Sequence, residues 1–204
     1  MLAHVFADAI SALRDAFEAA FLERQPFEER FQSDVLLGDI TREPSYGLPG
    51  EGEPPRIVAH ITFSWPAWSQ AAYRRWYVDD ELEQQPAIEI EIVLRVQQLA
   101  EPADAERIYA AVPEHSGDLG EDRLERDGLT TEVAHPDPAD PLALRSEYAV
   151  EVTYGGLYEL AEETVADGRS SLLDDHFGSL GGWIAATLVR LGDLDLAFLT
   201  PDAD

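Results

Sequence analysis

The chain has 204 residues, of which 41 are acidic and 14 are basic, and its formal net charge is −27. Every basic residue is an arginine, because the sequence contains no lysine, and it contains no cysteine either. The missing lysine excludes Schiff-base chemistry, and the missing cysteine excludes disulfides, thiol nucleophiles and cysteine-ligated metals.

The charge balance predicts a protein of a salt-rich cytoplasm. A net charge of this size lies far outside the roughly 2–8 of an ordinary small domain. At about 1 M salt the Debye length is only about 3 Å, so that repulsion between the carboxylates is nearly silenced. Hydrophobic residues make up 45% of the chain, which is enough for a core and argues against an acidic disordered segment. We therefore expect a halophilic globular protein, typical of the acidic proteomes of archaeal-type cells.

Composition also narrows the location and the partners. No basic segment precedes the first apolar residues, and no apolar run approaches the ~20 residues of a membrane span, so we expect a cytoplasmic protein without membrane contact. The acidity disfavours nucleic acid, because affinity for nucleic acid rests on neutralising phosphates, although molar salt weakens this argument. A nucleic-acid mimic is a further alternative, and it requires carboxylates gathered on one elongated face.

The first 55 residues predict one helix, one short strand and a long loop. Apolar residues recur every three or four positions over residues 2–22, which predicts an amphipathic helix. The run SDVLLGDI at residues 33–40 predicts a short strand. Residues 41–55 hold three glycines and four prolines, which predicts an exposed loop without regular structure.

Three later strands are predicted by the alternation of apolar and polar residues. They are Arg56–Trp65, Ala87–Gln97 and Glu147–Tyr154, with a weaker strand at Leu129–Ala134. Strands with one apolar and one polar side are typical of an antiparallel sheet that is covered by helices on one face only.

Helices are predicted between and after these strands. The predicted ranges are Pro66–Val78, Ala103–Val112 and, after the turn signal Gly155–Gly156, residues 157–167 and 170–192. Residues 113–128 and 135–141 are rich in acids and prolines and predict acidic loop insertions.

Together these elements predict a single α+β domain over residues 1–204. Its core is expected to be an antiparallel sheet of about five strands, with the N- and C-terminal helices packed on one face. The order of elements resembles the arrangement of helices and strands in secretion chaperones. That resemblance lies in the order of elements alone and implies a fold, not a function.

The segment Ser64–Val78 (SWPAWSQAAYRRWYV) is the most unusual part of the sequence. It holds three of the four tryptophans and the Arg-Arg pair of the chain. On a helix, Trp68 and Trp76 fall on one stripe and Arg74 on the opposite side. The stripe is interpreted either as the buried face of the helix or as a surface for a protein partner or a small ligand. The predicted binding residues are Trp68, Tyr73, Arg74, Arg75, Trp76 and Tyr77.

A second candidate site is a pocket beneath the loop at residues 41–55. Long loops without secondary structure are often functional lids. Polar residues on the strands beside it could line such a pocket, namely His60, Ser64, Glu89 and Glu91. The strand glutamates are also typical of an ordinary solvated sheet face.

Motifs of catalysis and cofactor binding are missing from the sequence. It contains no phosphate-binding loop, dinucleotide fingerprint, nucleophile elbow or paired-histidine zinc motif. We therefore predict no catalytic residues, no metal site and no cofactor. This favours a non-enzymatic interaction or accessory domain that binds a protein partner or itself. The alternative is a small-molecule-binding protein or enzyme that uses the pocket under residues 41–55.

Overall fold

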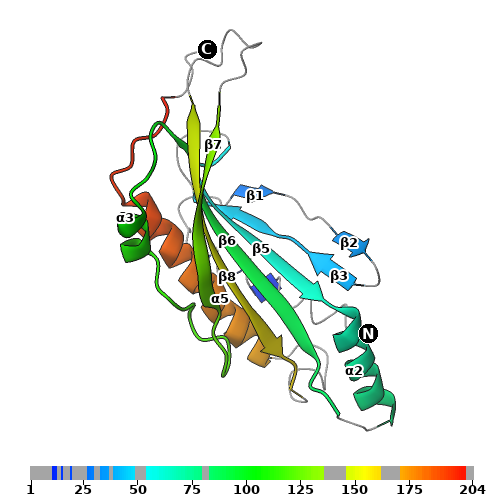
Figure 1. The fold of residues 1–204 in the computed structure, drawn as a ribbon. Coiled ribbons are helices and arrows are strands. Elements are labelled where there is room, and N and C mark those ends of the chain that lie inside the picture. Colours follow the sequence, from blue (N-terminus) through cyan, green and yellow to red (C-terminus); the bar gives the residue numbers. More distant parts are fainter. Residues whose placement is uncertain are drawn as a thin grey trace.

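A single antiparallel sheet organises the protein in the computed structural model (Figure 1). The structure describes residues 11, 12, 15, 19, 27–29, 33–36, 39–48, 54–79, 83–135, 146–161 and 171–200. Within these residues eight strands pair in the order β1-β4-β5-β6-β8-β7, and the β2-β3 hairpin joins the sheet through β3 and β5. The predicted antiparallel α+β class is confirmed, but the expected number of about five strands was too low.

The three predicted alternating strands form the centre of the sheet. They are β5 (Ile57–Trp65), β6 (Ala87–Leu99) and β8 (Glu147–Glu159), and β7 (Glu125–Ala134) pairs with the outer side of β8. Their apolar residues are buried on one side, as the period of two requires. Because partners across an antiparallel ladder share a face, the polar residues of these strands gather on the other side.

The strands before β5 differ from the prediction. The predicted strand 33–40 is a hairpin of β2 (Ser33–Leu36) and β3 (Asp39–Arg42). The predicted loop 41–55 contains the end of β3 and also β4 (Ser45–Gly47), which pairs with β1 (Phe27–Glu29) and β5. β3 and β4 pair with successive parts of β5, so backbone pairing overrides the proline and glycine signals there.

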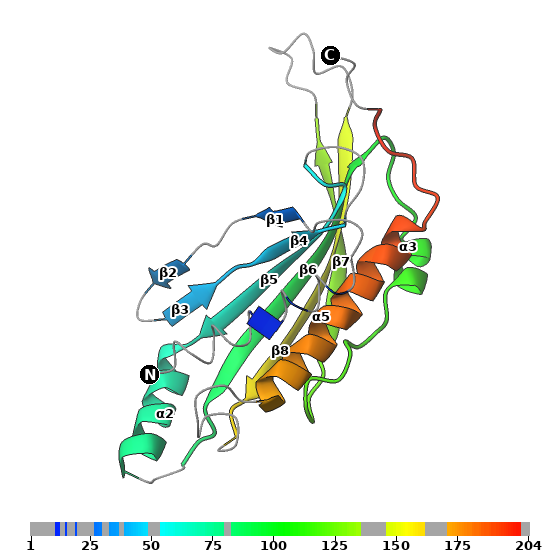
Figure 2. The same cartoon turned by 180° about the vertical axis from the view of Figure 1, so that it is seen from behind.

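Helix α5 (Ser171–Gly192) runs along one face of the sheet, and no described helix covers the opposite face (Figures 1 and 2). Its buried residues recur at helical spacing and meet the apolar side of the strands; they are Leu173, Phe177, Leu180, Ile184, Leu188 and Leu191. Phe177 packs edge-on against Phe63 and Tyr158. Each of these side chains contributes about 1.5–3 kcal/mol by leaving water, which places the core between α5 and the sheet.

The predicted end of the strand at Tyr154 is wrong, because β8 continues through Gly155 and Gly156 to Glu159. A Cβ on Gly155 would lie 2.9 Å from the Asp127 carboxylate, and one on Gly156 would lie 2.8 Å from the Leu124 side chain. The glycines therefore accommodate side chains from the neighbouring segment rather than a turn. The helix predicted at 157–167 is wrong up to Glu159, and residues 162–167 lie outside the described part.

The remaining predictions are met in part. Helix α3 (Ala105–Ala111) confirms the helix at 103–112, and the predicted insertion 113–128 already contains the start of β7. Of the predicted N-terminal helix, residues 11, 12, 15 and 19 are described and are helical. Of the segment 135–141, only His135 lies inside the described residues. None of the described helices is long and apolar enough to cross a membrane.

Candidate functional site

Helix α2 (Ala67–Asp79) is attached to the sheet by the buried hydroxyl of Ser69. This hydroxyl donates to the carbonyl of Ala87 at 2.6 Å and accepts hydrogen bonds from the Ala87 amide at 2.8 Å and the Trp65 indole at 3.1 Å. One donor and two acceptor sites are all that a serine hydroxyl offers. Ser69 therefore fixes the first turn of α2 against the ends of β5 and β6.

The buried side of α2 is rotated from the predicted stripe. Tyr73 packs edge-on against both Trp65 and Trp76, with ring centroids 6.2 Å and 6.0 Å apart. Tyr73 is buried and Trp76 is half-buried, whereas Trp68 is 38% exposed. Of the two interpretations of the stripe, burial holds for Trp65 and in part for Trp76 but not for Trp68, and the predicted binding residue Tyr73 lies in the core.

The exposed side of α2 joins Trp68 to the two arginines of the helix. Trp68 and Arg75 are seven positions apart, so they lie on nearly the same side two turns from each other. Ala71, which is exposed, lies between them, and Arg74 is exposed beside Arg75. We call Trp68, Ala71, Arg74 and Arg75 the α2 patch. Tyr77 belongs to the same helix, but its side chain lies outside the described part.

The α2 patch differs in charge from the rest of this acidic chain. No aspartate or glutamate occurs between Glu53 and Asp79 in a sequence that holds 41 of them. Arg75 forms an exposed ion pair with Glu83 at 2.7 Å, which is worth little in stability because both groups face water. The patch therefore combines an exposed indole with two guanidiniums, and the acidic residues resume only at Asp79, the last residue of α2. In the sequence, this surface is indicated by the absence of aspartate and glutamate from residues 54–78.

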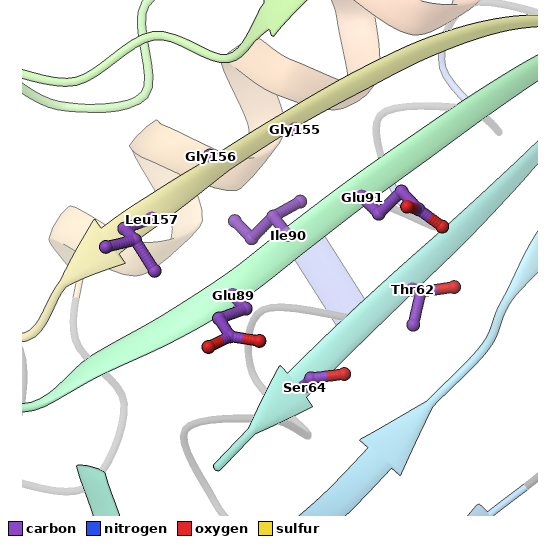
Figure 3. A pocket seen from close by; sticks show the side chains of 8 residues that line it. All are labelled: Thr62, Ser64, Glu89, Ile90, Glu91, Gly155, Gly156 and Leu157. Atoms are coloured by element: carbon purple, nitrogen blue, oxygen red, sulfur yellow. The ribbon is translucent and has the colours of Figure 1, made fainter. Parts of the chain in front are cut away.

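The second surface is a depression of about 420 Å³ on the open face of the sheet (Figure 3). Its lining residues come from β5, β6 and β8 and are Thr62, Ser64, Glu89, Ile90, Glu91, Gly155, Gly156 and Leu157. Thr62 pairs with Glu91 and Ser64 with Glu89, so each hydroxyl lies beside a carboxylate across the ladder. Hydroxyls can donate and ionised carboxylates accept, which suits a ligand rich in hydrogen-bonding groups.

Three of the four residues predicted for the alternative pocket line this depression, namely Ser64, Glu89 and Glu91. His60 does not, because its ring nitrogen Nδ1 is hydrogen-bonded to the hydroxyl of Ser45 at 2.9 Å. No described residue of segment 41–55 contributes to the lining, so the predicted lid has no counterpart in the described part of that segment. Thr62, Gly155 and Leu157 were not predicted.

A charged cluster of β6, β8 and β7 residues lies on the same sheet face, farther along the strands from the depression. Arg95 forms ion pairs with Glu132, at 2.9 Å, and with Glu151. Burial disfavours the charged guanidinium, but the hydrogen bonds with Glu151 and Glu132 outweigh it and raise the pKa of Arg95. Burial and the nearby Arg95 lower the pKa of His60, while Glu151 acts in the opposite direction. This cluster holds neighbouring strands together.

Neither surface has the composition of a metal centre. Among the described residues, no group of three or more histidine, aspartate or glutamate side chains could hold a metal ion. Comparisons of the chain with models of protein families, with curated proteins and with solved structures found no match. Within the described residues, the fold and the two surfaces define an antiparallel α+β protein in which α5 packs on the sheet and the arginine-tryptophan helix α2 follows β5.

Proposed function

We propose that this protein is a non-enzymatic binding module that docks a protein partner on the α2 patch. The observation that carries the proposal is the exposure of Trp68, Arg74 and Arg75 on α2, in a stretch that holds no acidic residue before Asp79. Tryptophan and arginine supply most binding energy at protein interfaces, and interface centres are poor in acidic residues. In an otherwise carboxylate-rich protein, an exposed indole with two neighbouring arginines is a surface suited to contact with a partner.

The partner is expected to present an apolar recess flanked by carboxylates. The guanidiniums of Arg74 and Arg75 select for acidic groups, since like-charge contacts are unfavourable and opposite-charge contacts set the orientation. In molar salt these long-range attractions are screened to about 3 Å. Burial of the Trp68 indole is not screened, so it supplies the affinity and the arginines supply the specificity.

The test is affinity capture in molar KCl with purified wild-type protein and three variants. Trp68→Ala and Arg74→Glu change the α2 patch, whereas Tyr109→Ala is the matched control. Tyr109 lies on α3 and is 38% exposed, the same fraction as Trp68. Binding of the captured protein is then measured with purified components.

We expect Trp68→Ala to weaken binding by about 10- to 100-fold, as truncation of an interface hot spot does. Arg74→Glu should also weaken binding, and this loss should be larger in lower salt. Tyr109→Ala should leave binding unchanged. Far-UV circular dichroism of all variants should match the wild type, because the changed side chains are exposed. Equal binding by wild type and Trp68→Ala would refute the assignment of the α2 patch.

A second candidate function uses the depression on the open face as a small-molecule site. Its support is the grouping of Thr62, Ser64, Glu89 and Glu91 in one concavity. Carboxylates and hydroxyls together favour a cationic or polyhydroxylated compound. Screening amines and polyols by thermal shift in molar KCl tests this alternative, with Glu91→Gln as the site variant. A compound that stabilises wild type and Glu91→Gln equally would not be using the depression.

A further inference from the structure

Strand β7 forms one edge of the sheet, and most of its length is exposed (Figure 1). Residues Thr130 to Ala134 are all exposed. The segment at Glu114–Ser116 pairs with the outer side of β7 only near its start, through the bridge of His115 with Glu125. Among the described residues, nothing pairs with the outer side of β7 from Leu129 to Ala134.

The direction of the backbone groups in this edge follows from two observations. The amide of Arg126 donates outward, to the carbonyl of Glu114 at 3.0 Å. A bulge at Asp127 then adds one residue to β7, so that Gly128 pairs with Thr153 and Thr130 with Glu151. Hydrogen bonds alternate along an antiparallel ladder, which turns Gly128, Thr130 and Glu132 toward β8. Leu129, Thr131 and Val133 therefore present their amides and carbonyls to the outside.

After the bulge at Asp127, the edge from Leu129 to Ala134 lacks the features that usually prevent pairing with another strand. Soluble proteins protect such edges with prolines, lysines, bulges or charges among the outward groups. Between Leu129 and Ala134 the chain has no proline, and its single charge, Glu132, is ion-paired to Arg95 on the open sheet face. Two threonines and a valine give this stretch high strand propensity.

We propose that β7 pairs antiparallel with β7 of a second copy of this chain, with the two-fold axis at Thr131. Such a pairing joins the two sheets and uses the same patch on both molecules, as a two-fold interface requires. The outward residues then form hydrogen-bonded pairs of Leu129 with Val133, Thr131 with Thr131, and Val133 with Leu129. These pairs exchange about six backbone hydrogen bonds.

The side chains also favour a second copy in this register. Leu129 and Val133, which is 43% exposed, form an apolar cross-strand pair twice. On the opposite face each Glu132 lies across from Thr130 of the other copy, so that no two carboxylates are directly opposed. Repulsion between two molecules of charge −27 is screened in molar salt, and dimerisation should therefore weaken as salt is removed.

The test is the oligomeric state in molar KCl, measured by sedimentation equilibrium over a range of protein concentrations. The wild type should be a concentration-dependent dimer, because a short two-strand interface is small and gives modest affinity. Thr131→Pro removes the outward amide at the axis from both copies, and an edge strand tolerates proline where the amide faces solvent. We expect the dissociation constant to rise tenfold or more in Thr131→Pro.

Two further variants separate pairing from folding. Thr131→Val keeps the amide and the strand propensity and should leave the dimer intact. Val133→Glu keeps the backbone but places a carboxylate opposite Leu129 of the other copy, and it should abolish the dimer while the melting temperature of the monomer is retained. A wild type that is monomeric at every concentration would overturn the proposal. It would do so even if β7 were found to bind an extended peptide of another protein. A dimer that Thr131→Pro and Val133→Glu leave intact would overturn it as well. Because Thr131 is remote from the α2 patch, neither result decides the proposed function.

Discussion

Replacement of Ser69 by alanine tests how α2 is held to the sheet. The change removes one hydroxyl that is fully buried and makes three hydrogen bonds, to the carbonyl and amide of Ala87 and to the indole of Trp65. All three partners lose a hydrogen bond in a site that excludes water. At about 1 kcal/mol net for each bond, the expected loss of stability is about 3 kcal/mol. For a chain of this size such a loss lowers the melting temperature by about 6–12 °C.

The measurement is thermal unfolding by circular dichroism in molar KCl, with Ser179→Ala as the matched control. Ser179 is an exposed residue within α5, so that the control has the same gain in helix propensity without the buried hydrogen bonds. We expect Ser179→Ala to shift stability by less than about 0.5 kcal/mol. If both variants melted at the same temperature, the hydroxyl of Ser69 would not be what fixes α2.

Three further predictions concern the proposed salt-rich habitat, the packing of β8 and the titration of His60. Dilution from about 1 M to about 0.1 M KCl increases the Debye length from about 3 Å to about 10 Å. The carboxylates then repel one another, and the near-UV circular dichroism signal should weaken. An unchanged spectrum would contradict the halophilic interpretation. Gly156→Ala should destabilise by about 1–3 kcal/mol in thermal unfolding, because its Cβ would lie 2.8 Å from the Leu124 side chain. Gly128→Ala, where the same atom meets open space, should show no such loss. The pKa of His60 is lowered below 6.5 in the folded protein. The unfolded chain therefore takes up the proton first, and stability falls as the pH drops through 6.5. A His60→Gln variant whose melting temperature follows pH just as the wild type does would refute this.

Sequence periodicity predicted the centre of the fold because burial there is one-sided. β5, β6 and β8 each have one face against α5 and one face open, so that their apolar residues alternate. The strands β3 and β4 gave no such pattern, since they are short and are held by backbone pairing with β5. Backbone pairing does not depend on side-chain identity, and proline and glycine signals around it therefore predicted a loop.

Two local features required knowledge of distant neighbours. Gly155 and Gly156 are typical of a turn, but here they make room for Asp127 and Leu124, which are far away in sequence. Helical spacing placed Trp68 with Trp76, whereas the anchor at Ser69 turns α2 so that Tyr73 faces the core. The candidate residues Arg74 and Arg75 were found from composition, and their exposure came only from the fold.

The lining of the depression on the open face could also be predicted only in part. Ser64, Glu89 and Glu91 were predicted from their positions on polar strand faces, since the register of β5 with β6 follows from alternation. The contribution of Gly155 and Leu157 could not be predicted, because β8 was expected to end before them. When a strand continues past its last alternating residue, the local sequence does not indicate where the strand ends.

The central claim is that a partner protein contacts the exposed side of α2. Its most direct test is a photo-reactive phenylalanine analogue placed at Ala71, in the middle of the α2 patch, in cells kept at their native salt. The same analogue at Ala110, an exposed residue of α3, is the control. We expect a specific cross-linked partner from position 71 that is absent from position 110 and is lost with Trp68→Ala. Identical products from both positions, or no product from position 71, would contradict it.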